Sequence, residues 1–288
     1  MAYNEEKNIA HLLLAIQNQK LIKLEISEII VVASGCTDRT EEIVNNFSQK
    51  DSRIKLISQL KRKGKSSAIN LWLKNTTGEI LILESADTIP NESSLEKLTA
   101  PFENNRIGMT GAHLIPVDNP KTLMGFATHL LWHLHHIIAI ETPKMGEVVA
   151  FRNIISSIPE NSAVDEGSLE AEIVKNGYHL AYAPEATIKN KGPETISDFL
   201  SQRRRIFAGH LWLKNNFNHQ VSTMNGIKIF KILVKNLNWN SREIIFTPLV
   251  ILLEIWGRFL GWYDYRILKK NPAIWNIAKS TKNLSLKS

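Results

Sequence analysis

Apolar and polar positions in the first 115 residues alternate between two spacings. Short β-branched runs predict buried strands, and apolar residues three and four positions apart predict helices. Asp38 with Glu41 and Ser93 with Glu96 resemble the capping boxes that begin helices. Strands alternating with helices predict an α/β fold with a doubly wound, mostly parallel sheet. The strand-like runs cover residues 27–34, 54–58, 79–84 and 107–115, and the helix-like segments cover residues 9–16, 40–47 and 65–75.

The start of the chain departs from this alternation. Asn4 can cap a helix that begins within a few residues of Met1, and no strand-like run precedes that helix. A doubly wound sheet normally begins with a strand. Either the fold begins with a helix, or this sequence lacks the first strand of its sheet.

The middle of the chain is less regular, apart from a helix predicted at residues 126–140. His129, His133 and His136 share one face of that helix, a spacing that can bind a metal ion. No nearby acid or cysteine completes a ligand set, so we favour an aromatic packing face or a contact with a membrane surface. Further on, the pattern predicts helices that begin at Asp165 and after Pro193, with a strand at residues 178–183 between them.

The C-terminal part has a different character. Residues 244–253 are apolar around Pro248, and charged residues then interrupt the run. Aromatic and basic side chains beside an apolar helix are typical of the membrane–water interface. A helix packed on the preceding domain is the alternative. The aromatic and basic residues in question are Trp256, Trp262, Tyr263, Tyr265, Arg266, Lys269 and Lys270.

Composition narrows the class of protein. The chain has 288 residues and is 43% hydrophobic, which suits one large domain or one domain with an appendage. Its net charge of +7 suits anionic partners such as nucleotide phosphates, phospholipid headgroups or nucleic acid. No nucleic-acid recognition motif accompanies that charge. Cys36 is the only cysteine, so an intrachain disulfide is excluded, and the polar start predicts no signal peptide.

Polar clusters fall where predicted strands end or helices begin. They cover residues 4–6, 34–38 and 61–65, and Asp87 follows the apolar strand-like run at 79–84. In such folds ligands gather at the carboxyl ends of the strands. Asp87 is therefore placed to hold a cation or a phosphate-bound metal, unless it only caps a turn. The basic, Gly-containing cluster leads into a helix N-terminus, which favours phosphate, unless it is a solvated run of charge.

Two further clusters carry candidate chemistry. Asp165 and Glu166 are adjacent carboxylates, and mutual repulsion in a cleft would raise the pKa of one of them and help it accept a proton. An acidic helix start is the structural alternative. The run Arg203–Arg205 could hold a diphosphate, or it could be a solvated face or a contact with anionic lipid.

The ordered set of motifs resembles the family 2 glycosyltransferases, which have the GT-A fold. The resemblance covers roughly residues 1–210. The family also has a strand before the first helix, which favours a missing first strand here. The matching motifs are Ala-Tyr-Asn-Glu-Glu at 2–6, Val-Val-Ala-Ser-Gly-Cys-Thr-Asp-Arg-Thr at 31–40, Lys-Gly-Lys-Ser-Ser-Ala-Ile-Asn at 63–70, Ser-Ala-Asp at 85–87, Asp-Glu-Gly-Ser-Leu at 165–169, Gly-Tyr at 177–178, Tyr-Ala-Pro-Glu-Ala at 182–186 and Gln-Arg-Arg-Arg-Ile at 202–206.

That resemblance implies transfer of a sugar from a nucleotide-sugar to an acceptor hydroxyl, with inversion. Asp87 would ligate Mn or Mg, which bridges the diphosphate. Glu166 would be the general base, with Asp165 as the alternative. Gln202, Arg204 and Arg205 would contact the acceptor or the diphosphate, and His210 is a weaker candidate for a metal or phosphate contact. The residues implied to bind the nucleotide-sugar are Tyr3, Asn4, Glu5, Ser34, Asp38, Lys63, Lys65 and Ala86.

The sequence departs from the family pattern at four points. Ala33 and Ser34 stand where two acids are common, Ser85 replaces the first acid of the Asp-x-Asp motif, and Ile206 replaces a tryptophan. These changes leave a second hypothesis open, a non-catalytic or truncated relative that binds a nucleotide-sugar or a glycan.

The resemblance also suggests an organisation and a location. We expect a GT-A domain at 1–215, with a nucleotide-binding half at 1–115 and an acceptor-binding half at 116–215, followed by a helical region at 216–288 that associates with a membrane. Many relatives act on lipid-linked acceptors in polysaccharide or glycolipid biosynthesis. The expected location is therefore the cytoplasm, at the cytoplasmic face of the cell membrane.

Overall fold

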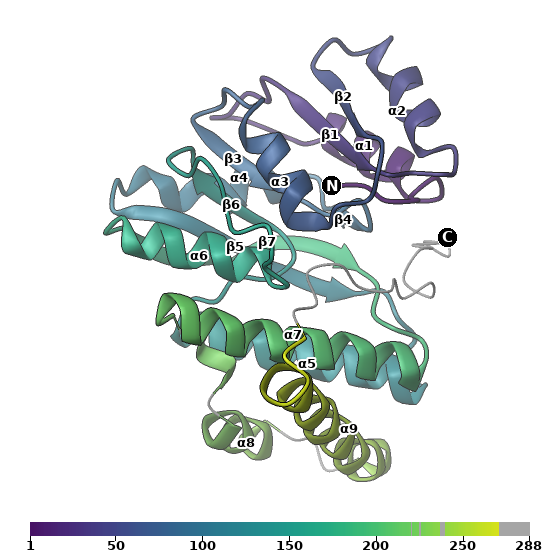
Figure 1. Ribbon diagram of the computed structural model, residues 1–288, viewed down its shortest axis with the longest axis vertical. Helices are drawn as coiled ribbons and strands as arrows, with labels where there is room; N and C mark the ends of the chain where they lie inside the picture. The colour runs from purple at the N-terminus through teal and green to yellow at the C-terminus, as the bar shows by residue number, and fades with distance from the viewer. Residues whose placement is uncertain (220, 225, 237–239, 271–288) are drawn as a thin grey trace.

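A computed structural model describes residues 1–219, 221–224, 226–236 and 240–270. Two β-sheets occupy one end of the molecule, and long helices form the other (Figure 1). The sheets hold β1 (Ile29–Ser34), β2 (Ile54–Gln59), β3 (Ile80–Leu83), β4 (Thr88–Pro90), β5 (Ile107–Pro116), β6 (Val149–Arg152) and β7 (His179–Asn190). The helices are α1 (Ile9–Gln17), α2 (Thr40–Ser48), α3 (Lys65–Leu73), α4 (Ser94–Thr99), α5 (Leu123–Glu141), α6 (Asp165–Lys175), α7 (Ile196–Phe217), α8 (Gly226–Lys235) and α9 (Ser241–Arg266), with short 3-10 turns at Ala100–Glu103 and Ser222–Met224.

The sheets combine parallel and antiparallel pairs. Strands β1 and β2 run parallel as a two-stranded sheet, and the second sheet has the order β3-β6-β5-β7-β4. Within the larger sheet only β5 and β7 are parallel, and the other three pairs are antiparallel. The α/β class is confirmed, but the strand directions are more mixed than predicted. Strand β4 follows β3 after a short loop, and β6 follows α5 but runs antiparallel to β5. Neither strand was recognised in the sequence.

Residues 1 and 2 lie between the two sheets. The Ala2 amide donates to Val32 O of β1 at 2.9 Å, and the Ser34 amide donates back to Ala2 O at 3.0 Å. On the other side, Met1 O accepts from the Ala86 amide at 3.2 Å, and the Met1 amino group donates to Glu84 O at 2.9 Å. The chain start therefore fills the position of a strand end beside β1 and fixes the segment that carries Asp87.

Apolar clusters on the two faces of the larger sheet hold its helices in place. Phe151 of β6 and Leu83 of β3 pack with Ile69 of α3 and Leu169 of α6 in one fully buried cluster. On the opposite face, Leu98 of α4 belongs to a second cluster with buried residues of β5 and β7. Because α3 and α6 begin at residues 65 and 165, this packing brings two polar helix starts to the same edge of the sheet.

Neither expected capping box forms. The Asp38 carboxylate accepts from the Glu6 and Thr40 amides, and the Glu41 carboxylate accepts from the Ser58 hydroxyl. Glu96 accepts from amides in the loop between α1 and β1 instead of capping α4. In each expected box the glutamate, Glu41 or Glu96, binds a group that is distant in sequence instead of an amide at the start of its own helix.

The histidine face of α5 serves packing. His136 Nδ1 lies 2.8 Å from the Tyr182 hydroxyl of β7, and its ring stacks on His113 of β5 at 3.9 Å between centroids. His129 Nε2 lies 2.9 Å from the Asp118 carbonyl oxygen. Among the described residues, no three His, Cys, Asp or Glu side chains are grouped to hold a metal ion. The aromatic packing interpretation is therefore the better one for this helix.

Small residues bring α9 close to α7. A Cβ added at Gly257 would lie 2.7 Å from Arg203 Cβ, and one added at Gly261 would lie 2.5 Å from Arg204 O. The Arg204 guanidinium pairs with the Asp264 carboxylate across the same interface. Glu254 and Asp264 of α9 thus face α7, and many of the large apolar residues of α9 face outward.

The C-terminal helices also bear on two expectations. Helices α5 and α9 are each long and apolar enough to cross a membrane by length and composition, although half of the α5 window is buried inside the protein and 22% of the α9 window is. The sequence analysis expected membrane association of the C-terminal region but identified no helix long enough to cross a membrane. The proposed boundary at residue 215 falls in the last turn of α7, and residues 271–288 of the expected helical region lie outside the described residues.

Candidate active site

One large cavity, of about 1060 Å³, lies where the sheet edge meets the long helices. We call its first side the loop wall, which is formed by Met1, Ala2, Tyr3, Glu5, Ser34, Arg62, Gly64, Lys65, Ser85 and Asp87. Its second side, the helical wall, is formed by residues of α5, α7, α8 and α9. The start of α6, with Asp165 and Glu166, lies between the two walls.

The two acids at the start of α6 share one lysine. Lys65 Nζ lies 2.6 Å from Asp165 Oδ2 and 2.7 Å from Glu166 Oε1. The contact with Asp165 is an ion pair and not an aligned hydrogen bond, since Asp165 Oδ2 has no hydrogen-bond partner. Lys65 is the first residue of α3, so this triad joins the helix starts that the sheet packing brings together.

Within this triad, burial and neighbouring charges shift the pKa of Lys65 and the pKa of Glu166. Burial lowers the pKa of Lys65, but the charges of Asp165 and Glu166 outweigh it and raise that pKa above the ordinary value. Burial, and then the charge of Asp165, raise the pKa of Glu166. A carboxylate with a raised pKa binds a proton more tightly, which is the property that a general base requires.

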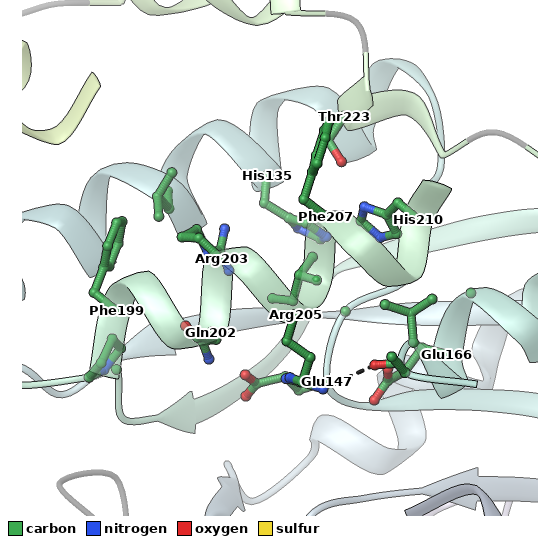
Figure 2. A pocket seen from close by; sticks show the side chains of 18 of the residues that line it. His135, Glu147, Glu166, Phe199, Gln202, Arg203, Arg205, Phe207, His210 and Thr223 are labelled. Carbon is green, nitrogen blue, oxygen red and sulfur yellow. Dashed lines mark hydrogen bonds between the residues drawn. The ribbon is translucent and has the colours of Figure 1, made fainter. Parts of the chain in front are cut away.

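Arg205 and Glu147 extend the polar site toward α7. The Arg205 guanidinium lies between Glu147 and Glu166 (Figure 2), and its Nη1 donates to Ala163 O at 3.0 Å. Burial lowers the pKa of Arg205, and the charges of Asp165 and Glu166 oppose that shift. Burial, and then the charge of Asp87, raise the pKa of Glu147 to about 7. Glu147 also accepts from Asn190 Nδ2 at 3.2 Å.

Asp87 and Glu147 are the residues that could hold a divalent cation. Both line the cavity, and the charge of Asp87 contributes to the raised pKa of Glu147. Within the described ranges no three-ligand group is present, so protein atoms there would not complete a closed metal site. Mg²⁺ and similar ions are commonly held by one or two carboxylates together with substrate phosphates. The donor set therefore fits a cation that is shared with a bound diphosphate.

The loop wall carries a possible stacking surface for a base. The Arg62 guanidinium lies 4.6 Å from the centre of the Tyr3 ring, within cation–π range. Gly35, with φ of +68°, allows the loop after β1 to approach this region, because a Cβ there would lie 2.5 Å from the Arg62 backbone nitrogen. Ser34 donates to Gln59 at 2.7 Å, which fixes its hydroxyl at the cavity edge.

The predicted site residues divide into two groups. Asn4 and Asp38 do not line the cavity, and their side chains join the turn after Ala2 to the loop after β1. Lys63 is exposed and also lies off the cavity, as does buried Ala86. The predicted residues that do line it are Tyr3, Glu5, Ser34, Lys65, Asp87, Asp165, Glu166, Gln202, Arg204 and Arg205.

The structure refines three of these predictions. Glu5 is 3% exposed and accepts from Asn8 Nδ2 at 2.9 Å, so its carboxylate also braces the start of α1. Arg204 is paired with Asp264 and would have to leave that pair to reach a diphosphate. His210 lines the cavity, but burial lowers its pKa well below the usual range, so it is neutral. A neutral imidazole does not add charge for binding phosphate.

Sequence reasoning missed other residues of the cavity. Glu147 and Lys144 lie in the irregular stretch before β6, where no periodicity identifies inward-facing positions. Arg62 belongs to the basic cluster at 61–65, but the sequence analysis named only the neighbouring lysines as nucleotide-sugar contacts. Arg258 lies on α9 and lines the cavity. A charged residue within an otherwise apolar helix was the sequence signal that could have identified Arg258.

These features define a GT-A type glycosyltransferase fold. They are the mixed α/β layers, the sheet edge where Asp87 and the acid pair lie, and the cavity beside that edge. The chain belongs to glycosyl transferase family 2, whose sequence model matches residues 1–163. The recognition made from the motifs, and the enzyme class that it implies, are thereby confirmed.

Curated relatives and solved structures agree with this assignment. A probable glycosyltransferase of Bacillus subtilis, YdaM, is 25% identical over 75% of this chain and 55% of its own length. Poly-beta-1,6-N-acetyl-D-glucosamine synthase of Staphylococcus aureus is 23% identical over 77% of this chain and 56% of its own. The chain thus spans about half the length of these relatives. A Pyrobaculum calidifontis mannosyltransferase solved with GDP-Man and Mn²⁺ superposes with a TM-score of 0.62, at 18% identity, over 89% of this chain and 71% of that one.

Proposed function

We propose that this chain transfers a sugar from a nucleotide-sugar donor to an acceptor hydroxyl, with inversion and with the help of a divalent cation. The observation that carries this proposal is that Asp87, Lys65 and the acid pair all line one cavity. These residues come from distant parts of the sequence, and a fold that needed them only for surface charge would have no reason to gather them.

Glu166 is the general base in this proposal. Its carboxylate takes the proton from the acceptor hydroxyl, the acceptor oxygen bonds to the anomeric carbon, and the bond from that carbon to the diphosphate oxygen breaks. The nucleoside diphosphate leaves with the bonding electrons. Glu166 is 20% exposed at its side chain, against 2% for Asp165, so Glu166 is the more accessible acid. Asp165 is the alternative base, and otherwise it holds Lys65 in place.

Asp87 and Glu147 hold the cation in this proposal, as Mn or Mg. When bound, the ion neutralises charge on the diphosphate and so stabilises the leaving group. The raised pKa of Glu147 fits this role, because a cation there would favour the charged carboxylate. The Pyrobaculum calidifontis and Mycobacterium tuberculosis neighbours were solved with Mn²⁺, which supports a divalent cation without choosing between the two metals.

Tyr3, Arg62 and Ser34 lie where the nucleotide would bind. The Tyr3 ring with the Arg62 guanidinium offers a flat, cationic surface for a base. The free amides at the start of α3 favour phosphate oxygens. Neighbours solved with GDP-Man, UDP and UDP-GlcNAc support a nucleotide-sugar donor, and they do not select one.

The acceptor side of the proposal is a lipid-linked glycan or lipid met at a membrane surface, at the cytoplasmic face of the cell membrane. Helix α9 is inverted relative to an ordinary surface helix, since Glu254 and Asp264 face α7 while large apolar residues face outward. An exposed apolar face of this kind marks a contact with lipid or with another protein. Its exposed members include Ile245, Leu252, Ile255, Trp256, Phe259 and Trp262.

Vesicle sedimentation tests the membrane contact. The full chain should sediment with vesicles of phosphatidylcholine and phosphatidylglycerol, and the double variant Trp256→Ser/Phe259→Ser should remain in the supernatant. Leu60→Ser is the matched control, because Leu60 is 99% exposed on a loop of the other end of the molecule. A wild-type chain that ignores these vesicles would overturn the membrane assignment and leave the transferase assignment standing.

A second candidate is a non-catalytic relative that binds a nucleotide-sugar or glycan. Its support is Ser85, which lines the cavity where the family has an acid, together with the ion pairs that hold both acids on Lys65. This alternative predicts donor binding without turnover.

Release of nucleoside diphosphate from UDP-, GDP- and dTDP-sugars with Mn²⁺ separates the two candidates. We expect release from one donor, loss of that release on chelation, and loss in Asp87→Ala by about 10²-fold or more. Glu160→Ala, at an exposed acid off the cavity, is the control. Binding of a donor with no release under any metal would favour the non-catalytic candidate.

A further inference from the structure

Lys65 lies between the acid pair and the loop wall. Its side chain is 20% exposed and lines the cavity together with Arg62 and Gly64 of the preceding loop. Lys65 is also the first residue of α3, and the start of a helix favours phosphate oxygens. An ammonium carries three N–H donors. Glu166 accepts one of them and Asp165 lies at ion-pair distance, so at least one donor is left for a ligand in the cavity.

The two acids hold Lys65 through their negative charge. Lys65 Nζ donates to Glu166 Oε1 at 2.7 Å, and it lies 2.6 Å from Asp165 Oδ2 without an aligned hydrogen bond. Burial lowers the pKa of Lys65, and the charge of Asp165, followed by that of Glu166, raises it above the ordinary value. Because both contacts depend on ionised carboxylates, protonation of either acid weakens the hold on Lys65.

Sugar transfer changes the charge on each side of Lys65. In the proposed reaction Glu166 loses its negative charge when it takes the proton of the acceptor, and the diphosphate gains negative charge when its bond to the sugar breaks. Lys65 contacts Glu166 and belongs to the helix start that favours the phosphate oxygens. The attraction that holds the cation on the acids therefore falls in the same step in which the attraction of the leaving group rises.

We propose that Lys65 is a catalytic residue that moves from the acid pair to the leaving diphosphate during transfer. The inference rests on the proposed transferase function, and it states how the two ends of that reaction are coupled. The acceptor proton goes to Glu166, the acceptor oxygen bonds to the anomeric carbon, and the bonding electrons of the broken bond stay on the diphosphate oxygen. Lys65 keeps all of its protons and donates one N–H to that oxygen.

The surroundings of the acids return Lys65 after the product leaves. Arg205 stays on the acid side, because its guanidinium lies between Glu147 and Glu166 (Figure 2) and donates to Ala163 O at 3.0 Å. Asp165 is only 2% exposed at its side chain, and its Oδ2 atom has no hydrogen-bond partner. A buried carboxylate without its cation is unfavourable, so Lys65 returns once the diphosphate has gone.

A nucleoside diphosphate and its glucose conjugate differ in the charge that Lys65 is proposed to follow. The free terminal phosphate is fully ionised at pH 8, whereas the conjugate carries the sugar in its place. We would measure binding of UDP, GDP and dTDP and of their glucose conjugates to the full chain by isothermal titration calorimetry at pH 8 with Mn²⁺. The nucleotide that binds most tightly is then used with the variants.

Lys65→Met tests the contact with the leaving group. It should weaken binding of the nucleoside diphosphate about 10-fold and binding of the conjugate by less than about 3-fold, because only the first ligand has the extra charge. Lys63→Met, at an exposed lysine off the cavity, is the control and should change neither affinity. Equal losses for both ligands would overturn the inference. If Lys65→Met does not fold, Lys65→Gln takes its place, since its amide can still donate to Glu166.

Asp165→Asn should have the opposite effect, because it removes a charge that competes for Lys65. The nucleoside diphosphate should bind about 3- to 10-fold more tightly to this variant. Glu160→Gln, at an exposed acid off the cavity, is the control. Weaker or unchanged binding to Asp165→Asn would overturn the inference.

The double variant Asp165→Asn/Lys65→Met separates competition from simple repulsion. If Asp165 acts by holding Lys65, its replacement should change the affinity of Lys65→Met for the nucleoside diphosphate by less than about two-fold. If Asp165 merely repels the phosphate, the full gain should persist without Lys65, and that result would overturn the inference.

Turnover separates a failure of this inference from a failure of the proposed function. Lys65→Met should lower kcat about 10²-fold and leave the KM of the donor within about 3-fold. If donors are turned over but Lys65→Met weakens both ligands equally, the transferase stands and Lys65 only neutralises the acids. If the affinities change as expected but no donor is turned over, Lys65 contacts a bound diphosphate and its catalytic role is overturned. If neither ligand binds, the proposed function and the inference are both overturned.

Discussion

The two walls of the cavity are built in opposite ways. The loop wall consists of short turns at strand ends, held by backbone hydrogen bonds such as those of Met1 and Ala2. The helical wall consists of side chains on long helices, held by close packing at Gly257 and Gly261 and by ion pairs at Arg203 and Arg204. Backbone-built turns suit the fixed geometry of a nucleotide diphosphate, whereas helix faces with apolar side chains suit a bulkier and more variable acceptor.

The acid pair lies where the two walls meet, and changes there should have the largest effect. Glu166→Gln should lower the rate of sugar transfer by about 10²- to 10⁴-fold, the usual contribution of a general base. Donor binding should stay within about two-fold, because the loop wall is unchanged. Steady-state transfer kinetics and donor titrations measure the two effects.

Asp165→Asn is the matched comparison for that variant. If Glu166 is the base, Asp165→Asn acts through the position of Lys65 and should cost less than Glu166→Gln. The reverse order would make Asp165 the base. If both variants lose donor binding to the same extent, the two acids belong to the loop wall and not to the place where the two walls meet.

Lys65→Met should have the next largest effect, because it removes the cation that both acids share. Without it, the pKa of Glu166 should rise further, because the Lys65 charge lowers that pKa in the wild type. The acidic limb of the pH–rate profile for transfer should therefore move to higher pH, so that the variant recovers part of its activity as pH increases. Lys63→Met is the control, since Lys63 is exposed and off the cavity.

An unchanged acidic limb in Lys65→Met would mean that the rate does not depend on these carboxylates. Stability should be measured beside activity, because breaking a buried pair commonly costs about 3–5 kcal/mol. A variant that is merely unfolded would lose activity at every pH and would not shift the profile.

The loop wall was largely predictable from the sequence, and the helical wall was not. Asp87 follows an apolar run, and Lys65 begins a helix, so both positions could be read from local patterns. Lys144 and Glu147 lie in a stretch without periodicity, and Arg203 resembles its neighbours Arg204 and Arg205. Only the packing of α7 against α9 determines which of the three arginines faces which partner.

The same difference explains the errors in the fold. Parallel strands joined by helices produce a regular alternation, but antiparallel β4 and β6 are three and four residues long and leave no such pattern. Asn4 and Asp38 were predicted as nucleotide contacts because of their place in the motifs. Their side chains join the turn after Ala2 to the loop after β1, and their contact with a nucleotide stays a prediction. A motif residue can therefore be needed for the shape of a site without lining it.

A substitution at Gly257 should weaken the packing of α9 against α7 in the helical wall. Gly257→Ala would place a Cβ 2.7 Å from Arg203 Cβ, so α9 must shift away from α7. We expect a loss of about 1–3 kcal/mol in the free energy of unfolding, measured by urea denaturation. Gly226→Ala is the control, because a Cβ there meets nothing within 4 Å. Donor binding at the loop wall should survive in Gly257→Ala, and its loss would show that the two walls are not independent.

The smallest effect should come from Glu28, which lies just before β1 and off the cavity, where it binds Lys55, Thr76 and Thr77. Burial raises its pKa, but hydrogen bonds from Thr77, Lys55 and Thr76 outweigh that effect and lower the pKa from 4.5 to about 2. A lowered folded-state pKa gives stability that is present above about pH 4.5 and is lost as pH falls toward 2. Glu28→Gln should therefore cost up to about 1 kcal/mol at pH 7 and make unfolding less sensitive to acid.

Thermal unfolding of both chains between pH 7 and pH 3 measures this difference. The melting temperatures should differ most at neutral pH and converge as Glu28 becomes protonated in the wild type. Glu160→Gln, at an exposed acid, should follow the wild type throughout. Melting curves of Glu28→Gln that stay parallel to those of the wild type over this range would place the acid sensitivity elsewhere, with the acid pair and Asp264 of the helical wall as the next carboxylates to test.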